Sequence, residues 1–374
     1  MRTRLPHARA RPVVALRAAG LLLGIATSAG AGVAGTAPAP PYATGAHATE
    51  AASQQTQPAG PAPQGEALRA LIARAEAGNP VAQNALGERY ENGEGVQRDF
   101  AEAARWYRFA AAQGLAEAAL NLGVLYENGE GVEADLGEAA RWYRQAAADG
   151  DVLAQLTLGL MYREGRGVPR DHRQAVRWLR AVADRGFAIG QINLAFMYLD
   201  GLGVAQDDDR AATLLAEAAA RGHPVAQNNL AMLHRAGRGV PRDLELAASW
   251  HEKAARQGLA NAQYQLGLLY ERGEGVAPDD AQAARWYRDA AAQGEIPAQA
   301  RLALMYLEGR GVPQDDVLAY AWLALAAEGG EDASLREQAA QARASLEERM
   351  SAAEIAASRA KMAELRKAFG APAF

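Results

Sequence analysis

Residues 79–114, NPVAQNALGERYENGEGVQRDFAEAARWYRFAAAQG, decide the fold, because their pattern returns along this 374-residue chain at a fixed step of 36 residues. The turn sequence G-x-G-V begins at Gly93, Gly129, Gly165, Gly201, Gly237, Gly273 and Gly309. Self-similarity at a fixed period is the mark of repeat architectures, in which each unit packs on its neighbours. We therefore predict one array of seven repeats over residues 66–330, with repeat 1 at 79–114 and each later repeat 36 residues further on.

Each repeat is expected to form two antiparallel helices, A and B. Asn79 followed by Pro80 is a typical helix start, since a polar cap precedes a proline that needs no hydrogen-bond donor. The glycines that open each G-x-G-V turn end helix A, because glycine adopts left-handed backbone angles without steric cost. Asp99 caps helix B and Gly114 ends it. A lone helical pair cannot cover its apolar face, so the sequence predicts an all-α fold, an α/α superhelical solenoid.

This pattern closely resembles the Sel1-like repeat, a relative of the tetratricopeptide repeat, over residues 79–330. It reads A-x-x-x-L-G-x-x-Y-x-x-G-x-G-V-x-x-D-x-x-x-A-x-x-W-x-x-A-A-x-x-G. Departures from it are few and include Gly190 in place of alanine, Leu214 in place of tryptophan and His234 in place of tyrosine. The resemblance implies a tetratricopeptide-like helical repeat protein that binds other proteins. Relatives of this kind act in bacterial exopolysaccharide regulation, secretion and signalling.

The first 31 residues have the layout of a secretory signal peptide. Five arginines and no acid precede an apolar stretch at 18–28, and small residues at 29–31 suit a signal peptidase. We expect cleavage rather than a retained membrane anchor, and hence a periplasmic or secreted bacterial protein. Loss of the five arginines would take the net charge from −5 to −10. Residues 32–65, rich in proline and alanine, are expected to form a disordered linker.

The pattern changes after Gly330. Residues 331–374 are expected to form a C-terminal cap of two helices, at 333–349 and 351–369, because the last repeat of an array needs a polar outer face. Ser351 followed by Glu354 matches a capping box at the start of the second helix. A separate partner-binding or dimerising role for these helices remains an alternative.

Residues with the chemistry of an active site are scarce. The absence of cysteine excludes disulfides, thiolate zinc sites and cysteine nucleophiles. Acidic pairs such as Asp207-Asp208 and Asp279-Asp280 coincide with the cap of helix B, so capping explains them better than metal binding or acid–base chemistry. The sequence predicts no catalytic residues, cofactor, metal or nucleic-acid partner, the last because the net charge is acidic.

One motif keeps an enzymatic alternative open. Ser358 and Lys361 match S-x-x-K, which places a nucleophilic serine one helical turn from a lysine. Some cysteine-rich members of the Sel1-like family have been linked to penicillin binding and β-lactam hydrolysis. The companion motifs S-D-N and K-T-G are absent. An envelope hydrolase acting on β-lactams or peptidoglycan is therefore the alternative to a non-enzymatic scaffold.

Helix A lines the concave groove in the related tetratricopeptide arrays, and this places the candidate partner-binding residues here. An asparagine-rich row beside an apolar row would suit a protein or peptide partner. The residues chosen are Asn121, Val124, Leu160, Asn193, Phe196, Asn229, Met232 and Leu268, which we call the groove residues. The alternative is that the apolar members complete the packing between repeats. Helix-B arginines such as Arg141 and Arg144 are expected to be solvated.

Overall fold

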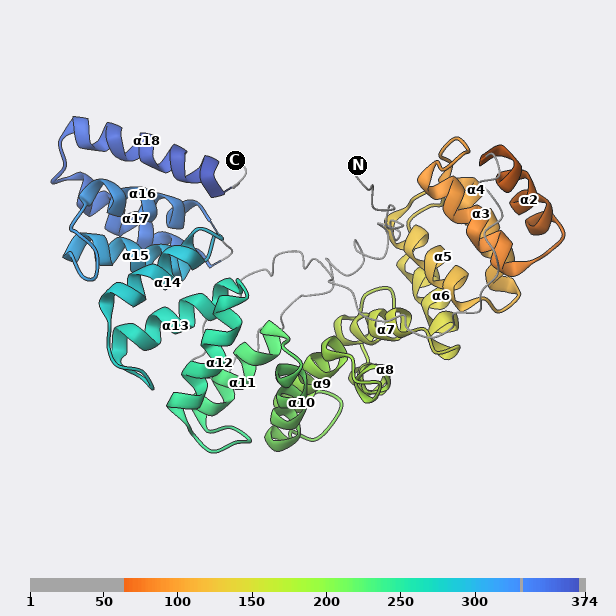
Figure 1. Ribbon diagram of the computed structural model, residues 1–374, viewed down its shortest axis with the longest axis horizontal. Coiled ribbons are helices and arrows are strands. Elements are labelled where there is room, and N and C mark those ends of the chain that lie inside the picture. Colours follow the sequence, from red (N-terminus) through yellow and green to blue (C-terminus); the bar gives the residue numbers. More distant parts are fainter. Residues whose placement is uncertain (1–63, 330–331, 370–374) are drawn as a thin grey trace, which may run out of the picture. The chain divides into compact units, whose positions relative to one another are not determined.

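The computed structural model describes residues 64–329 and 332–369, and this part of the chain is helical without strands (Figure 1). The helices are α2 (Gln64–Glu76), α3 (Pro80–Asn92), α4 (Phe100–Ala112), α5 (Ala116–Asn128), α6 (Leu136–Ala148), α7 (Val152–Glu164), α8 (His172–Asp184), α9 (Ala188–Asp200), α10 (Asp208–Ala220), α11 (Pro224–Ala236), α12 (Leu244–Arg256), α13 (Ala260–Arg272), α14 (Asp280–Ala291), α15 (Ile296–Glu308), α16 (Asp316–Glu328), α17 (Ala333–Glu347) and α18 (Ala352–Phe369). The predicted all-α solenoid of helix pairs is confirmed. The expected signal peptide lies outside the described residues, as does the linker up to residue 63.

The helices fall into two compact units. The first comprises the described residues up to Arg185 together with the turn at 202–204, and so holds α2 to α8. The second comprises residues 186–201 and the described residues from 205 onward, and holds α9 to α18. Within each unit, each helix up to α16 packs against the next along the chain, and α17 and α18 both pack against α16.

The helix boundaries follow the local signals in the sequence. The Asn79 side chain accepts a hydrogen bond from the Ala82 N–H at 2.9 Å, at the start of α3. Gly93 ends α3 with φ of +72°. All seven helix-B aspartates lie at the N-cap and accept backbone N–H groups of the first turn. Capping is thus the role of the aspartates that open the acidic pairs.

The second glycine of each turn is required by packing between repeats. A Cβ atom on Gly131 would lie 2.2 Å from the backbone carbonyl carbon of Phe100, at the start of helix B of the preceding repeat. The corresponding glycines from Gly167 to Gly311 meet the backbone of the preceding helix B in the same way. Gly95 meets only the Leu68 side chain, at 3.4 Å, because no complete repeat precedes it. The second glycine of the G-x-G-V turn therefore allows each repeat to pack closely against the preceding one.

A glycine in helix A makes room for a tyrosine of helix B. A Cβ atom on Gly123 would lie 2.6 Å from the Tyr143 ring, and Gly87 and Gly267 have the same relation to their own tyrosines. All three tyrosines are fully buried. Repeats 4, 5 and 7 carry alanine in place of this glycine and leucine or histidine in place of tyrosine. Repeat 3 combines Gly159 with Leu179, so every tyrosine at this position faces a glycine, but the glycine also occurs without the tyrosine.

An additional helix precedes the first repeat. Helix α2 packs Leu68, Leu71 and Ile72 against the buried Leu86 and Trp106 of repeat 1. It starts two residues inside the predicted linker and covers an end that would otherwise expose apolar surface. The missed signal is Gly78, which lies 36 residues before Gly114 and marks α2 as a helix B without its helix A.

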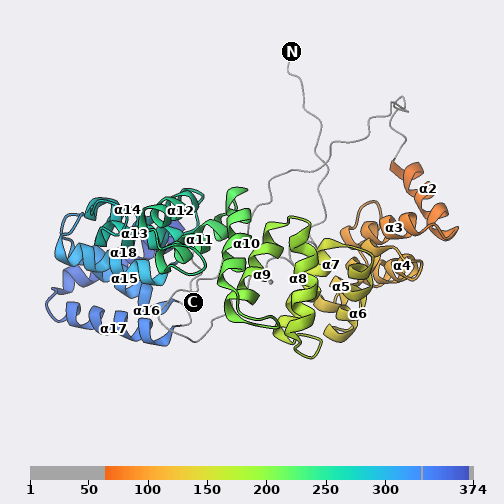
Figure 2. The ribbon, with the colours of Figure 1, turned by 90° about the horizontal axis from the view of Figure 1, so that it is seen from below.

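The two C-terminal helices agree with the sequence prediction. At the end of the second unit, α17 and α18 each lie beside α16 (Figure 1 and Figure 2). The Ser351 N–H donates to Glu354 at 2.8 Å and the Glu354 N–H donates to the Ser351 hydroxyl at 3.3 Å, which completes the capping box. Among the described residues, no helix is long and apolar enough to cross a membrane.

Candidate functional site on helix A

The apolar groove residues differ in how much surface they offer. The Val124, Leu160 and Leu268 side chains are 3%, 1% and 6% exposed and pack in the interior. Phe196 and Met232, at the same position of α9 and α11, are half-buried. Leu304 occupies this position in α15 and is 37% exposed. A partner could therefore contact this row only in the second unit, where Phe196, Met232 and Leu304 reach the surface.

The first asparagine of the row takes part in a short chain of side-chain hydrogen bonds. The Asn121 amide donates to Asn84 Oδ1 at 3.2 Å, and the Asn84 amide donates to Glu88 at 3.0 Å. These bonds join α5 to α3 across a repeat boundary. At this position the asparagine amide thus connects repeats within the protein.

The other two asparagines bond to their own helices. The Asn193 amide donates to the Ile189 carbonyl at 2.8 Å, and the Asn229 amide donates to the Val225 carbonyl at 2.7 Å. Asn193 is buried and Asn229 is half-buried. Each amide therefore already donates one hydrogen bond within its own helix, and Asn229 is the one of the two that also presents surface.

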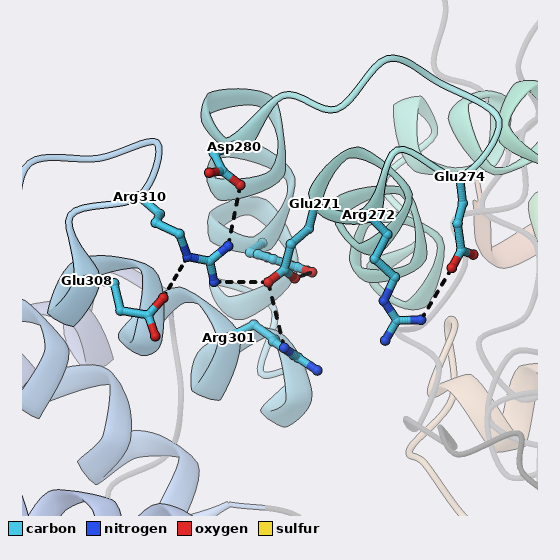
Figure 3. Close-up of polar contacts among 8 residues, drawn as sticks. Glu271, Arg272, Glu274, Asp280, Arg301, Glu308 and Arg310 are labelled. Atoms are coloured by element: carbon cyan, nitrogen blue, oxygen red, sulfur yellow. Dashed lines mark hydrogen bonds and ion pairs between the residues drawn. The ribbon is translucent and has the colours of Figure 1, made fainter.

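A buried polar pair at the end of helix A was missed from the sequence. The Tyr287 hydroxyl donates to Glu271 Oε2 at 2.6 Å, and Arg310 from the next turn donates to Glu271 Oε1 at 3.1 Å. Figure 3 shows Arg310 between Glu271, Glu308 and Asp280, with Arg301 also close to Glu271. The feature of the sequence that could have revealed this pair is that the tyrosines and the glutamates recur at the same 36-residue step.

The same pair occurs in the first unit with two different neighbours. In repeat 2, the Tyr143 hydroxyl donates to Glu127 at 2.6 Å, and Arg166 of the next turn also bonds to Glu127. In repeat 1, the Tyr107 hydroxyl donates to Glu91 at 2.5 Å, but Glu91 Oε1 is buried with no hydrogen-bond partner among the described residues. The turn position that holds arginine in repeats 3 and 7 is Glu130 in repeat 2.

These neighbours set the ionisation of the buried carboxylates. Burial raises the pKa of Glu91, and the charge of Glu130 adds to this against the opposing hydrogen bond from Tyr107. Burial also acts to raise the pKa of Glu271, but the hydrogen bonds from Tyr287 and Arg310 and the arginine charges outweigh it. The pKa of Glu271 is therefore lowered from its ordinary value.

The histidine of repeat 5 takes the place of the buried tyrosine. His251 is fully buried, and its Nδ1 lies 3.1 Å from Asn228 Oδ1. Burial lowers the pKa of His251 to about 3, and the nearby Arg235 charge acts in the same direction. His251 is thus neutral at physiological pH, and a structural role accounts for it.

The S-x-x-K motif does not present a nucleophile. Ser358 is fully buried, and its hydroxyl donates to the Glu354 carbonyl of the same helix at 2.8 Å. The Lys361 amine bonds to Glu364 at 2.5 Å, which raises the pKa of the lysine. A charged lysine is a poor base, so this geometry gives no support to the hydrolase alternative. No group of three His, Cys, Asp or Glu side chains that could hold a metal occurs within residues 64–329 and 332–369.

Comparison with known proteins identifies the repeats. The family model described as Sel1 repeat matches seven consecutive segments, residues 80–115, 116–151, 152–187, 188–223, 224–259, 260–295 and 296–331. A Sel1 repeat protein from Oxalobacter formigenes is 38% identical, with 74% of this chain and 80% of that chain covered and a TM-score of 0.66. The protective antigen c5321 of uropathogenic Escherichia coli, described as displaying an SLR fold, is 27% identical, with 81% and 87% covered and a TM-score of 0.48. The comparison with curated proteins found no match.

Proposed function

Because this chain belongs to the Sel1 repeat family, whose members are typically protein-interaction scaffolds, we propose that it is a non-enzymatic scaffold of the bacterial cell envelope. It binds a protein or peptide partner through the exposed face of helix A. The basic and apolar leader at residues 1–31 supports export. Signalling, secretion and exopolysaccharide regulation are the processes in which such an adaptor would act.

The observation that carries this proposal is the exposed apolar row of the second unit. Phe196, Met232 and Leu304 occupy one position of helix A in repeats 4, 5 and 7, and all three reach the surface. Asn229 adds a half-buried amide beside Met232. The row is interrupted at the buried Leu268 of repeat 6, but apolar side chains at one position of α9, α11 and α15 offer anchor points to a partner, with the amide as a polar contact. Of the other groove residues, Asn193 and Leu268 lie in the same unit as this surface, whereas Asn121, Val124 and Leu160 lie in the first unit and take no part in it.

The test compares two leucines of similar exposure. Leu304 in α15 is 37% exposed and lies in the row, whereas Leu246 in α12 is 36% exposed and lies on a helix B. Tagged full-length protein should capture one or more specific partners from an envelope extract. The Leu304→Asp variant should lose them, and the Leu246→Asp variant should retain them. Circular dichroism of both variants checks that the helices remain folded.

Equal capture by both variants would overturn the proposed surface. The envelope location is tested separately, by sequencing the N-terminus of the protein recovered from a periplasmic extract. A mature chain that begins near residue 32 supports export. A chain that begins at Met1 would contradict it.

A further inference from the structure

An open pocket of about 830 Å³ in the first unit is lined mainly by basic and aromatic side chains. Its lining residues lie at the start of α8, in α6 and α7, and in the turn at Gly203. Arg144, Arg170, Arg173 and Arg177 contribute four positive charges. We call this the α8 pocket. It belongs to none of the surfaces described above.

None of these arginines has an ion-pair partner within the described part of the chain. Arg144 donates to the Tyr162 hydroxyl at 3.1 Å, and the Arg177 guanidinium lies over the Trp178 ring at 5.0 Å from its centre. Stacking fixes the plane of a guanidinium and leaves its N–H edge available to a carboxylate. Arg144 was expected to be simply solvated, but the structure places it in the wall of this pocket.

The acid that neutralises this position in the first two repeats is missing from repeat 3. Arg105 pairs with Glu102 at 3.1 Å, and Arg141 pairs with Glu138 at 3.3 Å. The equivalent residue three positions before Arg177 is Gln174. Among the helices B of the seven repeats, α8 is the one with no acidic residue in its first turn.

The single carboxylate in the pocket is already engaged. Asp171 caps α8 by accepting the N–H groups of Arg173 and Gln174 at 2.9 Å and 3.1 Å. It therefore offsets part of the positive charge while its oxygen faces the backbone. The positive end of the α8 dipole lies at the same place. The net positive charge of the pocket therefore favours an anionic ligand.

We propose that the α8 pocket binds an acidic segment of a protein partner, with aspartate or glutamate carboxylates on the arginines. The inference rests on the proposed scaffold function and names a second contact surface for it. Arg170, Arg173 and Arg177 are spread along the chain from the turn into α8, so they match a series of carboxylates better than one compact ion. Trp178 and Tyr162 add apolar faces for aromatic side chains of the same segment. The volume lies within the usual range of ligand pockets in proteins.

The test uses a fluorescent oligo-glutamate peptide that contains tyrosine, and measures its binding to the full chain by fluorescence anisotropy. Gln174→Glu restores the acid of repeats 1 and 2 without removing an arginine. It should weaken binding about tenfold, because Arg177 would then pair within its own helix. Arg177→Gln should weaken binding to a similar extent. Added salt should weaken binding further, since the contacts are exposed ion pairs.

Repeat 6 supplies matched controls, because Gln282 and Arg285 occupy the same two positions of α14. Gln282→Glu and Arg285→Gln make the same charge changes in the second unit and should leave binding unchanged. Equal loss in the α8 and α14 variants would show a general charge effect and overturn the pocket. Pocket-dependent binding of polygalacturonate without binding of the peptide would also overturn the proposal and assign the pocket to an acidic polysaccharide.

The outcome is separable from that of the scaffold proposal. If the peptide does not bind but Leu304→Asp still abolishes partner capture, the α8 pocket fails and the scaffold function stands. If the peptide binds in a Gln174-sensitive manner but Leu304→Asp captures the same partners as wild type, the helix-A surface fails and the pocket stands.

Discussion

Repeats 1 and 6 contain the same buried tyrosine–glutamate pair, but the following turn brings opposite charges to it. Glu91 accepts one hydrogen bond from Tyr107 and faces the charge of Glu130, and its pKa is raised. Glu271 accepts from Tyr287 and Arg310, and its pKa is lowered. The pattern within one repeat therefore places the pair, whereas the neighbouring repeat decides whether its carboxylate is stabilised as an anion.

The largest expected effect on stability comes from disrupting the buried tyrosine–glutamate pair that repeats 1 and 6 share. Gly267→Ala would place a Cβ atom 2.6 Å from the Tyr287 ring, so the ring must move away from Glu271. We expect the free energy of unfolding to fall by about 3 kcal/mol, as for overpacked cores, in urea denaturation followed by circular dichroism.

The second substitution Tyr287→Leu should restore part of this loss, because repeat 7 combines Ala303 with Leu323 at the same two positions. A Gly267→Ala protein as stable as wild type would show that the glycine is not required beneath the tyrosine.

Glu295 is a further buried carboxylate to compare with Glu91 and Glu271, and one of its oxygens lacks a hydrogen bond. Its Oε2 has no hydrogen-bond partner among the described residues, and burial raises its pKa to about 7. The folded state therefore holds the proton more tightly than the unfolded chain does, and stability falls as pH rises from the ordinary value of 4.5 to about 7. Glu295→Gln should raise the free energy of unfolding by about 2 kcal/mol at pH 8. The same substitution should change the free energy of unfolding little at pH 4.

The control for this prediction is Asp289→Asn, which removes an exposed carboxylate from the adjacent helix α14. It should leave the pH dependence of unfolding unchanged. Parallel pH profiles for wild type and Glu295→Gln would contradict the assignment of this titration.

Removing the arginine should make the repeat 6 pair resemble that of repeat 1. Arg310→Met leaves Glu271 with fewer donors, and we expect a loss of about 1.5 kcal/mol at pH 7. Because the folded pKa of Glu271 is lowered, this contribution is present above pH 4.5 and disappears as the pH falls through the folded pKa.

Thermal unfolding at several pH values measures this dependence. Arg272→Met is the matched control, because the ion-pair partner of Arg272 among the described residues is the partly exposed Glu274, at 3.7 Å. An equal loss of stability in the two variants would mean that Arg310 stabilises the buried Glu271 carboxylate no more than a partly exposed ion pair would.

The smallest expected effect is a gain in the free energy of unfolding. Glu130→Arg gives repeat 1 the neighbour that repeats 2 and 6 already have, and should add about 1 kcal/mol to the free energy of unfolding at pH 7. Glu133→Arg makes the same charge change at an exposed residue of the same turn and should add less. Equal gains from both would indicate a general reduction of negative charge instead of a specific bond to Glu91.

Most of the fold could be predicted because its signals are local. The Asp99 cap and the Gly93 turn act through the backbone of adjacent residues, and their repetition gave the number of helix pairs. Helix α2 was missed because its copy of the pattern is incomplete and only Gly78 remains as a marker. The two C-terminal helices, with the Ser351 capping box, were predicted within two residues of their observed ends.

The candidate site was less predictable because exposure is a property of neighbouring repeats. Leu160 and Leu304 occupy the same position of helix A, yet one is 1% and the other 37% exposed. The asparagine row was recognised, but its hydrogen bonds to Asn84 and to helix carbonyls depend on side-chain positions. The α8 pocket escaped notice because its arginines come from two helices and a turn.

The sequence by itself determined the seven helix pairs, their boundaries and their caps, because each depends on residues within a few positions of one another. The tertiary structure alone decided which side chains of helix A reach solvent, which turn residue meets each buried glutamate, and which arginines line one pocket. These depend on contacts between residues some 30 to 40 positions apart, such as Arg310 with Glu271. A repeated pattern places such residues in equivalent positions, but the side chain present in the next repeat determines the contact.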